Sequence, residues 1–194
     1  MNTHSRIPMK NLSVDVAVIG AGTAGLAAYR AARARGATAV LIEAGPHGTT
    51  CARVGCMPSK LLIAAAEAAH AIDDAPGFGV HAVGGKRVDG VAVMARVRAE
   101  RDRFVGFVVK GVEGIPESDR LVGRARFTGR LSLEVEGVAK VAFRAAVIAT
   151  GSRPAVPPLL ARAGDRLVVN DDVFSWTDLP RSVAVFGPGV IGLE

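Results

Sequence analysis

The chain has few cysteines, few aromatic residues and no long apolar run, and each shortage excludes a class of protein. Two cysteines among 194 residues are too few for the disulfide framework of a small secreted domain. No segment approaches the roughly 20 apolar residues that span a bilayer, and the N-terminus has no apolar stretch long enough for a signal peptide. We therefore expect a soluble, cytoplasmic protein with no membrane partner.

The net charge of +6 does not by itself indicate a nucleic-acid partner. The arginines are scattered along the chain, and the aromatic residues, 5% of the total, are not interleaved with them as stacking platforms. We expect a solvated basic surface that favours dinucleotide phosphates only mildly, and no nucleic-acid partner. Hydrophobic residues make up 49% of the chain, which is ample for a buried core, and because aromatic residues are sparse we expect that core to consist of Val, Ala, Leu and Ile.

The segment after the N-terminus has the order of a βαβ unit. Residues 14–19 (VDVAVI) are a short apolar run typical of a buried parallel strand. The turn GAGTAG follows at 20–25, and an alanine- and arginine-rich helix is predicted over about 24–35. A second strand is predicted over 39–42, and it leads directly to Glu43.

The glycine turn and the acid after the second strand point to dinucleotide binding. Gly20 permits the tight turn, Gly22 lets the backbone approach a pyrophosphate, and Gly25 lets the helix pack closely on the strand. The helix N-terminus offers N–H groups and partial positive charge to the phosphates. Glu43, 23 residues after Gly20, lies where a carboxylate can accept hydrogen bonds from ribose hydroxyls. The alternative is a tight turn without a ligand.

The rest of the chain continues the α/β pattern. A proline- and glycine-rich loop separates two further helices, and the second has apolar residues at helical spacing, which favours core packing. Strands of a small meander, a proline-rich connector and another strand with a glycine turn follow. The predicted elements are helices over 58–72 and 91–112, strands over 121–127, 131–135 and 141–148, a connector over 154–158, a strand over 183–186 and the turn GPGVIG at 187–192.

The chain contains one internal repeat: the segments VDVAVIGAGTAG and RSVAVFGPGVIG share the pattern of a strand followed by a glycine turn. The second ends at Glu194 before its helix is complete, so we expect the chain to be the N-terminal part of a longer protein. The predicted fold class is α/β: a Rossmann-like dinucleotide-binding domain with a small β-meander insertion, followed by the truncated start of a second Rossmann domain.

Both cysteines lie in CARVGCMPSK, residues 51–60, where a helix is predicted to start. Positions five apart in a regular helix are about 7.5 Å apart along the axis, and a disulfide requires Cα atoms within roughly 4.4–6.8 Å. If Cys51 and Cys56 are bridged, the backbone between them is not regular helix, and Gly55 allows the bend. Regular helix can then begin near Cys56, with Pro58 in its first turn, where the helix dipole stabilises a thiolate.

Other interpretations of the cysteine pair remain open. Two ordinary buried cysteines are the commonest alternative. A zinc site is disfavoured, and we expect no metal, because the spacing is wrong and no second pair or histidine cluster supplies further ligands. A purely structural disulfide is disfavoured in a reducing cytoplasm. A redox-active disulfide is the favoured interpretation, and no role is assigned to the histidines, His4, His47, His70 and His81.

Taken together, these motifs resemble those of a known family. GAGTAG, Glu43, CARVGCMPSK, ATGSRP and VAVFGPGVIGLE occur in the order found in the flavoprotein disulfide reductases, which include dihydrolipoamide dehydrogenase, glutathione reductase and mercuric reductase. The resemblance covers nearly the whole chain and is greatest to dihydrolipoamide dehydrogenase. It implies an FAD-binding domain over residues 1–160, a connector over 161–180 and the start of an NAD(P)-binding domain over 181–194.

The resemblance also implies a role for each matching residue. Cys51 is expected to exchange with the substrate's sulfur, and Cys56 to lie against the flavin as a charge-transfer thiolate. Lys60 is expected at the flavin's redox centre, paired with Glu194. The other residues matched to cofactor contacts are Gly20, Gly22, Gly25 and Glu43 for the ADP half of FAD, Gly48, Thr50, Ala125, Thr150, Gly151 and Ser152 elsewhere along FAD, and Gly187, Gly189 and Gly192 for NAD(P).

The chain departs from the family pattern in its two glycine-rich loops. Thr49 occupies the second position of the usual Gly-Gly-Thr, and Pro188 stiffens the second glycine turn. The family's catalytic His–Glu pair, its second FAD-binding segment and its dimerisation domain are expected beyond residue 194.

The activity implied is an FAD-dependent dithiol/disulfide oxidoreductase that uses NAD or NADP. The implied substrate is a small dithiol, for example a lipoyl group, and the implied full-length protein is a homodimer. Two alternatives remain open. A mercuric or glutathione-type reductase would share this entire segment, whereas a non-catalytic redox sensor would use Cys51 and Cys56 to switch conformation without turning over a substrate.

Overall fold

The computed structural model describes residues 9–194, which divide into two compact units. The first unit combines the residues up to Thr49 with Phe107–Ser152, and the second combines Thr50–Gly106 with Arg153–Glu194. The first eight residues, which include His4 and part of the stretch where no signal peptide is expected, lie outside the described residues. The domain limits expected at residues 160 and 180 stay a prediction.

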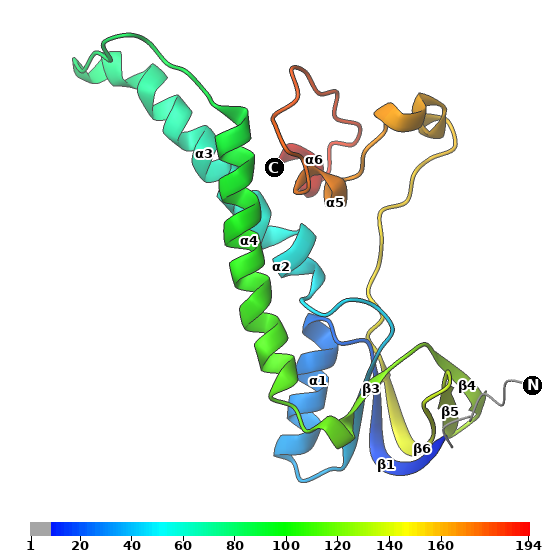
Figure 1. Ribbon diagram of the computed structural model, residues 1–194. Helices are drawn as coiled ribbons and strands as arrows, with labels where there is room; N and C mark the ends of the chain where they lie inside the picture. The colour runs from blue at the N-terminus through cyan, green and yellow to red at the C-terminus, as the bar shows by residue number, and fades with distance from the viewer. Residues whose placement is uncertain (1–8) are drawn as a thin grey trace, which may run out of the picture. The chain divides into compact units, whose positions relative to one another are not determined.

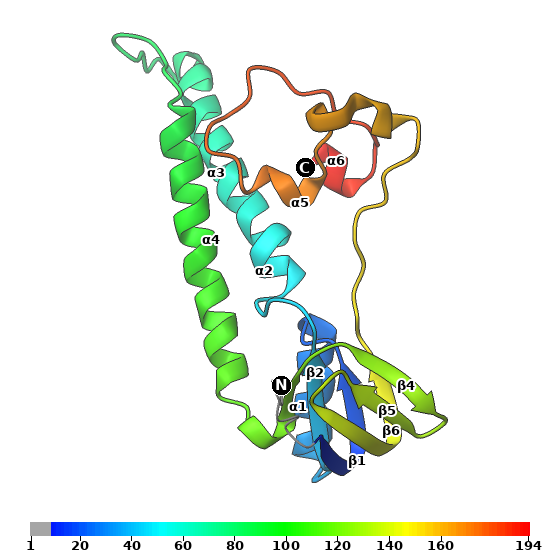
Figure 2. The same ribbon diagram turned by 45° about the vertical axis from the view of Figure 1, so that its right-hand side comes forward.

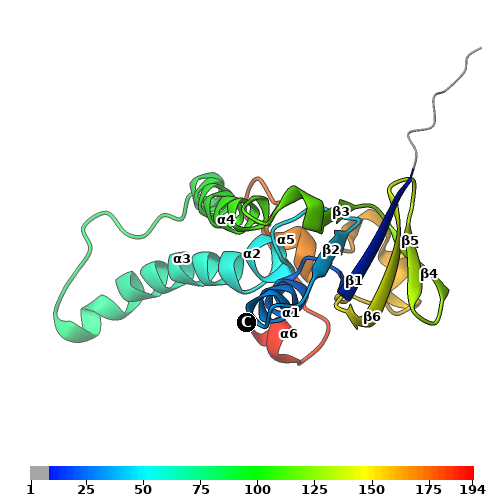
Figure 3. The same ribbon diagram turned by 90° about the horizontal axis from the view of Figure 1, so that it is seen from below.

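The first unit is built on a six-stranded sheet with the order β3-β2-β1-β6-β5-β4 (Figure 3). Strands β3, β2, β1 and β6 run parallel, and β6, β5 and β4 form an antiparallel meander. The α/β Rossmann-like prediction is confirmed. The strands are β1 (Lys10–Ile19), β2 (Ala39–Glu43), β3 (Arg120–Val122), β4 (Ala125–Gly129), β5 (Ser132–Val135) and β6 (Ala139–Ile148).

Strand β1 is longer than the apolar run that predicts it. Its first half, KNLS, alternates in polarity and was not expected to be strand. It is strand because it pairs with β6 from Lys10↔Ala139 onward, which buries Val141 opposite Leu12. The N-terminal end of β1 is therefore a half-buried strand, whereas its C-terminal end has the continuous apolar run of a fully buried strand.

The strand predicted over 121–127 is wrong as a single element. Gly123 lies between β3 and β4 with φ +155°, and a Cβ there would be 2.9 Å from Cγ1 of Val135. The chain therefore turns at this glycine. Strand β3 joins the parallel edge beside β2, whereas β4 starts the meander, so the segment serves two parts of the sheet.

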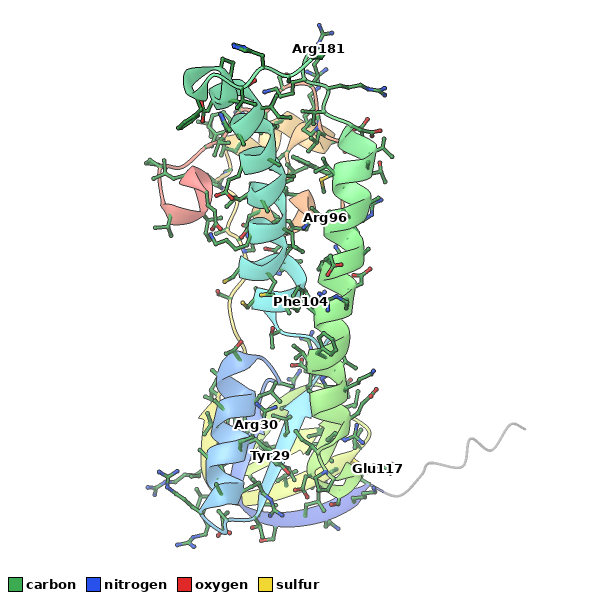
Figure 4. All side chains as sticks on the ribbon, turned by 90° about the vertical axis from the view of Figure 1, so that its left-hand side faces the viewer. Tyr29, Arg30, Arg96, Phe104, Glu117 and Arg181 are labelled. Carbon is green, nitrogen blue, oxygen red and sulfur yellow. The ribbon has the colours of Figure 1, made fainter. Side chains whose placement is uncertain are left out.

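Two apolar layers lie on opposite faces of the parallel strands. On one face the meander packs back on β1 and β2, with Leu133, Val135 and Val141 against Val40 and Ile42. The other face is covered by α1 (Thr23–Ala34) and the C-terminal end of α4 (Gly90–Glu113), and Figure 4 looks onto α1 in front of the sheet. Val, Ala, Leu and Ile dominate both layers, as predicted from the composition.

Tyr29 fixes α1 to the turn before β3. Its buried hydroxyl donates a hydrogen bond of 2.6 Å to Oδ2 of Asp119, in the short 3₁₀ helix η2 (Glu117–Asp119). Nε of Arg33 lies 3.6 Å from the same carboxylate oxygen. Figure 4 labels Tyr29 on α1 and Glu117 at the start of η2.

Replacing Tyr29 with phenylalanine is expected to lower the free energy of unfolding by about 1–2 kcal/mol at neutral pH, because Asp119 loses a buried donor. Burial, and then the bond to Asp119, raises the pKa of Tyr29 to about 12, above the value of about 10 for an unfolded tyrosine. The stabilisation is therefore complete below about pH 10 and is lost as the pH rises towards about 12.

Urea denaturation of the full-length protein and the Y29F variant, at neutral pH and near pH ~11, measures both effects. The difference between the two proteins should shrink at the higher pH. A variant as stable as the parent at neutral pH would show that the hydrogen bond contributes nothing.

The second unit is mainly helical. In Figures 1 and 2, α3 runs alongside the N-terminal half of α4. The predicted helices over 58–72 and 91–112 are confirmed with slightly wider limits. The elements are α2 (Thr50–Val54), α3 (Cys56–Asp74), η1 (Ala75–Phe78), the first part of α4, η3 (Leu160–Arg166), α5 (Asn170–Val173) and α6 (Val190–Leu193).

The strand predicted over 183–186 is not formed. Within the described residues, no neighbouring strand pairs with this segment, and the side chains of Val185 and Phe186 are 64% and 71% exposed. A strand requires inter-strand hydrogen bonds, which an apolar run cannot supply for itself.

None of the helices described between residues 9 and 194 is both long and apolar enough to cross a membrane.

Candidate functional site

The first glycine turn follows β1 and holds two backbone segments in close contact. Gly20 has φ +105°, and its N–H donates a 2.7 Å hydrogen bond to the carbonyl of Ile42. A Cβ on Gly20 would lie 2.2 Å from the carbonyl oxygen of Ala149, and one on Gly25 would lie 1.8 Å from the carbonyl oxygen of Gly20. Both positions therefore admit only glycine.

Gly22, the middle glycine, has open space around it. A Cβ there would meet no atom within 4 Å, and its φ of −77° is available to any residue. Gly22 is the N-cap of α1 and has no side chain to bond the first N–H groups of the helix. This end of α1 is therefore open to an anionic ligand, and the fold itself does not require glycine at this position.

Glu43 is held rigidly at the end of β2. Its Oε2 accepts a 2.7 Å hydrogen bond from the N–H of Ala21, inside the glycine turn. Its Oε1 accepts bonds of 2.9 Å and 2.8 Å from the N–H groups of Ala44 and Gly45. The backbone carbonyl of Glu43 accepts a 2.9 Å bond from Gly123. The carboxylate therefore lies beside the glycine turn.

The carboxyl ends of β1, β2 and β6 meet at this turn. Strand β1 lies between the other two, and the N–H of Ala149 donates a 2.8 Å bond to the carbonyl of Ile19. Ligands of α/β sheets bind at such an edge. Two apolar side chains at the same edge, Val122 and Ile148, are 66% and 67% exposed. The predicted residues Thr150, Gly151 and Ser152 follow directly and are exposed, and Ala125 is half-buried at the start of β4.

The loop between Glu43 and the cysteines contains a strained residue. Thr49 has φ +58°, and no other non-glycine residue among the described ones has a positive φ. A β-branched residue is unfavourable in this conformation, which glycine would adopt without strain. Gly48 beside it is buried with φ +123°. Nδ1 of His47 is buried without a hydrogen-bond partner in the described chain, a feature that the sequence pattern did not predict.

The cysteines lie on either side of a helix break. Helix α2 ends at Val54, Gly55 is non-helical with φ −130° and ψ −127°, and α3 begins at Cys56. A Cβ on Gly55 would lie 3.2 Å from Cα of Cys51, so glycine lets the two turns approach. The expected start of regular helix near Cys56 is confirmed, with Pro58 buried in the first turn, whereas the short helix α2 before Gly55 was not predicted.

Both cysteines are free thiols in the structure. Cys51 is half-buried, whereas Cys56 is exposed. Burial, followed by the hydrogen bond with Cys56 and the negative charge of Cys56, raises the pKa of the Cys51 thiol. The Cys51 thiol therefore holds its proton more strongly than an ordinary cysteine.

Lys60, one turn beyond Cys56, forms an ion pair with Glu194 through Oε1. Ser59 completes this group, because its hydroxyl oxygen lies 2.8 Å from the same carboxylate oxygen and 3.1 Å from the carbonyl oxygen of Cys56, and it can donate its one hydrogen to either acceptor. The bonds from Lys60 and then Ser59 lower the pKa of the Glu194 carboxyl. The role of Ser59 was not predicted, although it lies in the Pro-Ser-Lys motif.

The second glycine turn repeats the geometry of the first. Gly187 has φ +118°, and a Cβ on Gly192 would lie 2.1 Å from the carbonyl oxygen of Gly187. Gly189, like Gly22, has extended backbone with no atom within 4 Å of a Cβ. The turn is thus formed even though the strand before it is not. Among the described residues, no group of His, Cys, Asp and Glu side chains has the arrangement of a metal site.

A sequence model of the pyridine nucleotide-disulphide oxidoreductases matches residues 14–194. The chain belongs to this family. Family members are flavoproteins that bind FAD and use NAD(P)H. Similar proteins include the mercuric reductase of Shigella flexneri, 36% identical over 94% of this chain, and the glutathione reductase of Burkholderia cepacia, 35% identical over 96%. The dihydrolipoyl dehydrogenase of Halobacterium salinarum is 32% identical over 93% of this chain.

This family member spans 33% to 40% of the length of those three relatives. Among solved structures, the HOCl-induced flavoprotein disulfide reductase RclA from Escherichia coli is similar, with a TM-score of 0.74 and 22% sequence identity. The match covers 92% of this chain and 38% of the RclA chain. That likeness concerns the fold alone.

Proposed function

We propose that the full-length protein is an FAD-dependent dithiol/disulfide oxidoreductase of the dihydrolipoyl dehydrogenase type. It passes electrons between a small substrate dithiol, the Cys51–Cys56 pair, FAD and NAD(P). The observation that carries the proposal is the helix break at Gly55, which lies between Cys51 on α2 and Cys56 at the start of α3 and where a Cβ on Gly55 would lie 3.2 Å from Cα of Cys51. In a family of disulphide oxidoreductases, two cysteines brought together by such a break are suited to form and break a disulfide.

The first unit fits the ADP half of FAD. The open space at Gly22 and the uncapped start of α1 suit a pyrophosphate, and the Glu43 carboxylate suits a ribose. Exposed apolar side chains at the same edge suit an aromatic base. The family resemblance, rather than the arrangement of the two units, assigns Cys56, Lys60 and Glu194 to the flavin end. FAD, when bound, supplies the two-electron chemistry that joins a thiol couple to a nicotinamide.

The chain's own residues account for the exchange with substrate. A substrate thiolate attacks Cys51 in the disulfide, the S–S bond breaks, and Cys56 leaves as a thiolate at the start of α3. The second substrate thiolate attacks the substrate sulfur of the mixed disulfide and releases Cys51. The substrate becomes a disulfide, and the pair gains two electrons. One of the substrate's two protons stays on Cys51, in keeping with its raised pKa, and the other is released.

A mercuric or glutathione-type reductase is the second candidate, favoured by the 36% and 35% identities to relatives with these names. Activity with dihydrolipoamide, glutathione disulfide and Hg(II), each with NADH and NADPH, distinguishes the candidates and the nicotinamide. A redox sensor would turn over none of them. From its resemblance to the flavoprotein disulfide reductases, we also propose that the full-length protein is a homodimer and lies in the cytoplasm.

An anaerobic titration of the full-length flavoprotein with NADH, followed by visible absorbance, tests the proposal. We expect a new long-wavelength charge-transfer band after two electrons, because the thiolate of Cys56 would donate to the oxidised flavin. Direct bleaching of the flavin without such a band would show that the cysteines are not coupled to it, and the proposed function would then be wrong.

A further inference from the structure

A strap of chain, residues 170–179, lies along the N-terminal half of α4 in the second unit. It contains α5 and the segment that follows it. Phe174 is 7% exposed and packs against Met94 and Val97, both fully buried on α4. At the start of α4 the strap comes closest, because a Cβ on Gly90 would lie 2.2 Å from Oδ1 of Asp178 and 2.9 Å from the N atom of Leu179.

Two arginines of α4 hold the strap by its backbone carbonyls. Nη1 of Arg101 donates a 2.8 Å bond to the carbonyl of Phe174, and Nη1 of Arg98 donates to the carbonyl of Trp176. The Arg101 side chain is only 17% exposed, and Oδ1 of Asp102 accepts from its Nε at 2.8 Å. Because arginine keeps its charge, both donors are present at every physiological pH.

The strap also contacts the two helices that carry the cysteines. Helix α5 contacts α2, the helix that carries Cys51. The apolar cluster around Phe174 includes Val54, between the two cysteines, and Leu61, directly after Lys60. A third arginine of α4, Arg96, donates a 3.3 Å bond to the carbonyl of Leu61, and Figure 4 labels it on α4 beside α3. The strap therefore touches both helices whose junction sets the distance between the sulfurs.

We propose that Arg98 and Arg101 are positioning residues for the redox pair: by holding the strap on α4 they fix α2 against α3, and so they set the thiol–disulfide equilibrium of Cys51 and Cys56. The proposal rests on the proposed function, because it requires that the pair forms a disulfide. Neither arginine touches a cysteine. Their effect passes through the strap and the apolar cluster.

The direction of the effect follows from preorganisation. A disulfide is favoured when the protein holds the two thiols at a high effective concentration relative to each other. Releasing the strap lets α2 move against α3, which gives the dithiol state more freedom than the bridged state. The equilibrium should therefore shift towards the dithiol, by about tenfold, which for a two-electron couple is about 30 mV.

The experiment uses the full-length flavoprotein, equilibrated anaerobically with mixtures of dithiothreitol and its cyclic disulfide. Acid quenching, alkylation and mass spectrometry then give the fraction of Cys51 and Cys56 present as thiols. Amide hydrogen exchange of residues 170–179 reports whether the strap is docked. The variants are R98M/R101M, which keeps the aliphatic stems, and G90A, which crowds the strap from its other end without altering an arginine.

We expect faster exchange in the strap and the shift towards dithiol in both variants, while R98M/R101K, which keeps a donor at residue 101, restores part of the parent equilibrium. Arg87 gives a matched control, because this exposed arginine has no hydrogen bond or ion pair to the described chain, and R87M should behave as the parent. Bound flavin and hydrogen exchange in the sheet should match the parent in every variant, which separates release of the strap from unfolding.

Two results would overturn the proposal. Faster amide hydrogen exchange in the strap with an unchanged thiol–disulfide equilibrium would show that the strap does not control the equilibrium of Cys51 and Cys56. Unchanged strap exchange in both variants would show that the arginines and Gly90 do not control docking. A different outcome concerns the proposed function alone: if the parent pair never forms a disulfide at any ratio of the two reagents, that function fails first.

Discussion

Replacing Cys51 with serine should lower dithiol-dependent reduction of NAD(P)+ by the full-length protein by about a thousandfold or more, since residues that act as a unit in catalysis fail together. A serine hydroxyl has nearly the shape of the thiol but cannot form a disulfide. Cys51 is half-buried and packs at the break before α3, so the near-isosteric change should leave the fold intact. Steady-state assays with dihydrolipoamide and flavin absorbance measure the result.

The partner variant C56S separates the two roles. Both variants should lose turnover, but only C51S should retain a thiolate at residue 56 and hence a charge-transfer band. Cys56 is the exposed sulfur at the start of α3. If C51S turned over dithiol like the parent, or if C56S kept the band, the assignment of roles to the two cysteines would be wrong.

Replacing Gly25 with alanine should destabilise the first unit by about 3 kcal/mol or more, because overpacking against a fixed backbone cannot be relieved by a side-chain rotation. The new Cβ would lie 1.8 Å from the carbonyl oxygen of Gly20, in a turn that also carries the hydrogen bond from Gly20 to Ile42. Thermal unfolding and expression of soluble full-length protein measure the loss.

Gly22 provides the matched control, since G22A adds the same methyl group to the same turn. No atom lies within 4 Å of its Cβ, so the variant should fold with stability close to that of the parent. It should nevertheless lose much of its affinity for FAD, because the methyl group would occupy the space left for the pyrophosphate. The prediction is that Gly25 is needed for folding and Gly22 for binding FAD. Equal destabilisation by G22A and G25A would contradict it, as would normal flavin content in G22A.

Local sequence signals predicted the elements whose causes are local. Residues 14–25 and 39–43 combine an apolar run, glycines and a terminal acid, and each feature acts within a few residues of itself. The helix break at Gly55 was predictable for the same reason, because a glycine and a proline at fixed spacing limit where regular helix can begin. Family resemblance, rather than pattern, led to the expectation that Lys60 and Glu194 are paired.

Errors occurred where pairing over long distances decides the structure. The split at Gly123 depends on two different partners, β2 for one side and β5 for the other. The apolar run at 183–186 has strong strand propensity but no partner in the described chain. Propensity states what a segment can form, whereas hydrogen bonds from another segment decide what it does form.

The sequence by itself determined the α/β class, the two glycine turns and the place of the redox pair at a helix start, because each depends on backbone freedom or periodicity within a short segment. Only the tertiary structure decided that Glu43 bonds to Ala21, that Thr49 carries backbone strain, and that Arg98 and Arg101 hold a strap more than 70 residues away. Those contacts join residues far apart in the chain, and no local pattern records which distant carbonyl or carboxylate a side chain will meet once the layers have packed.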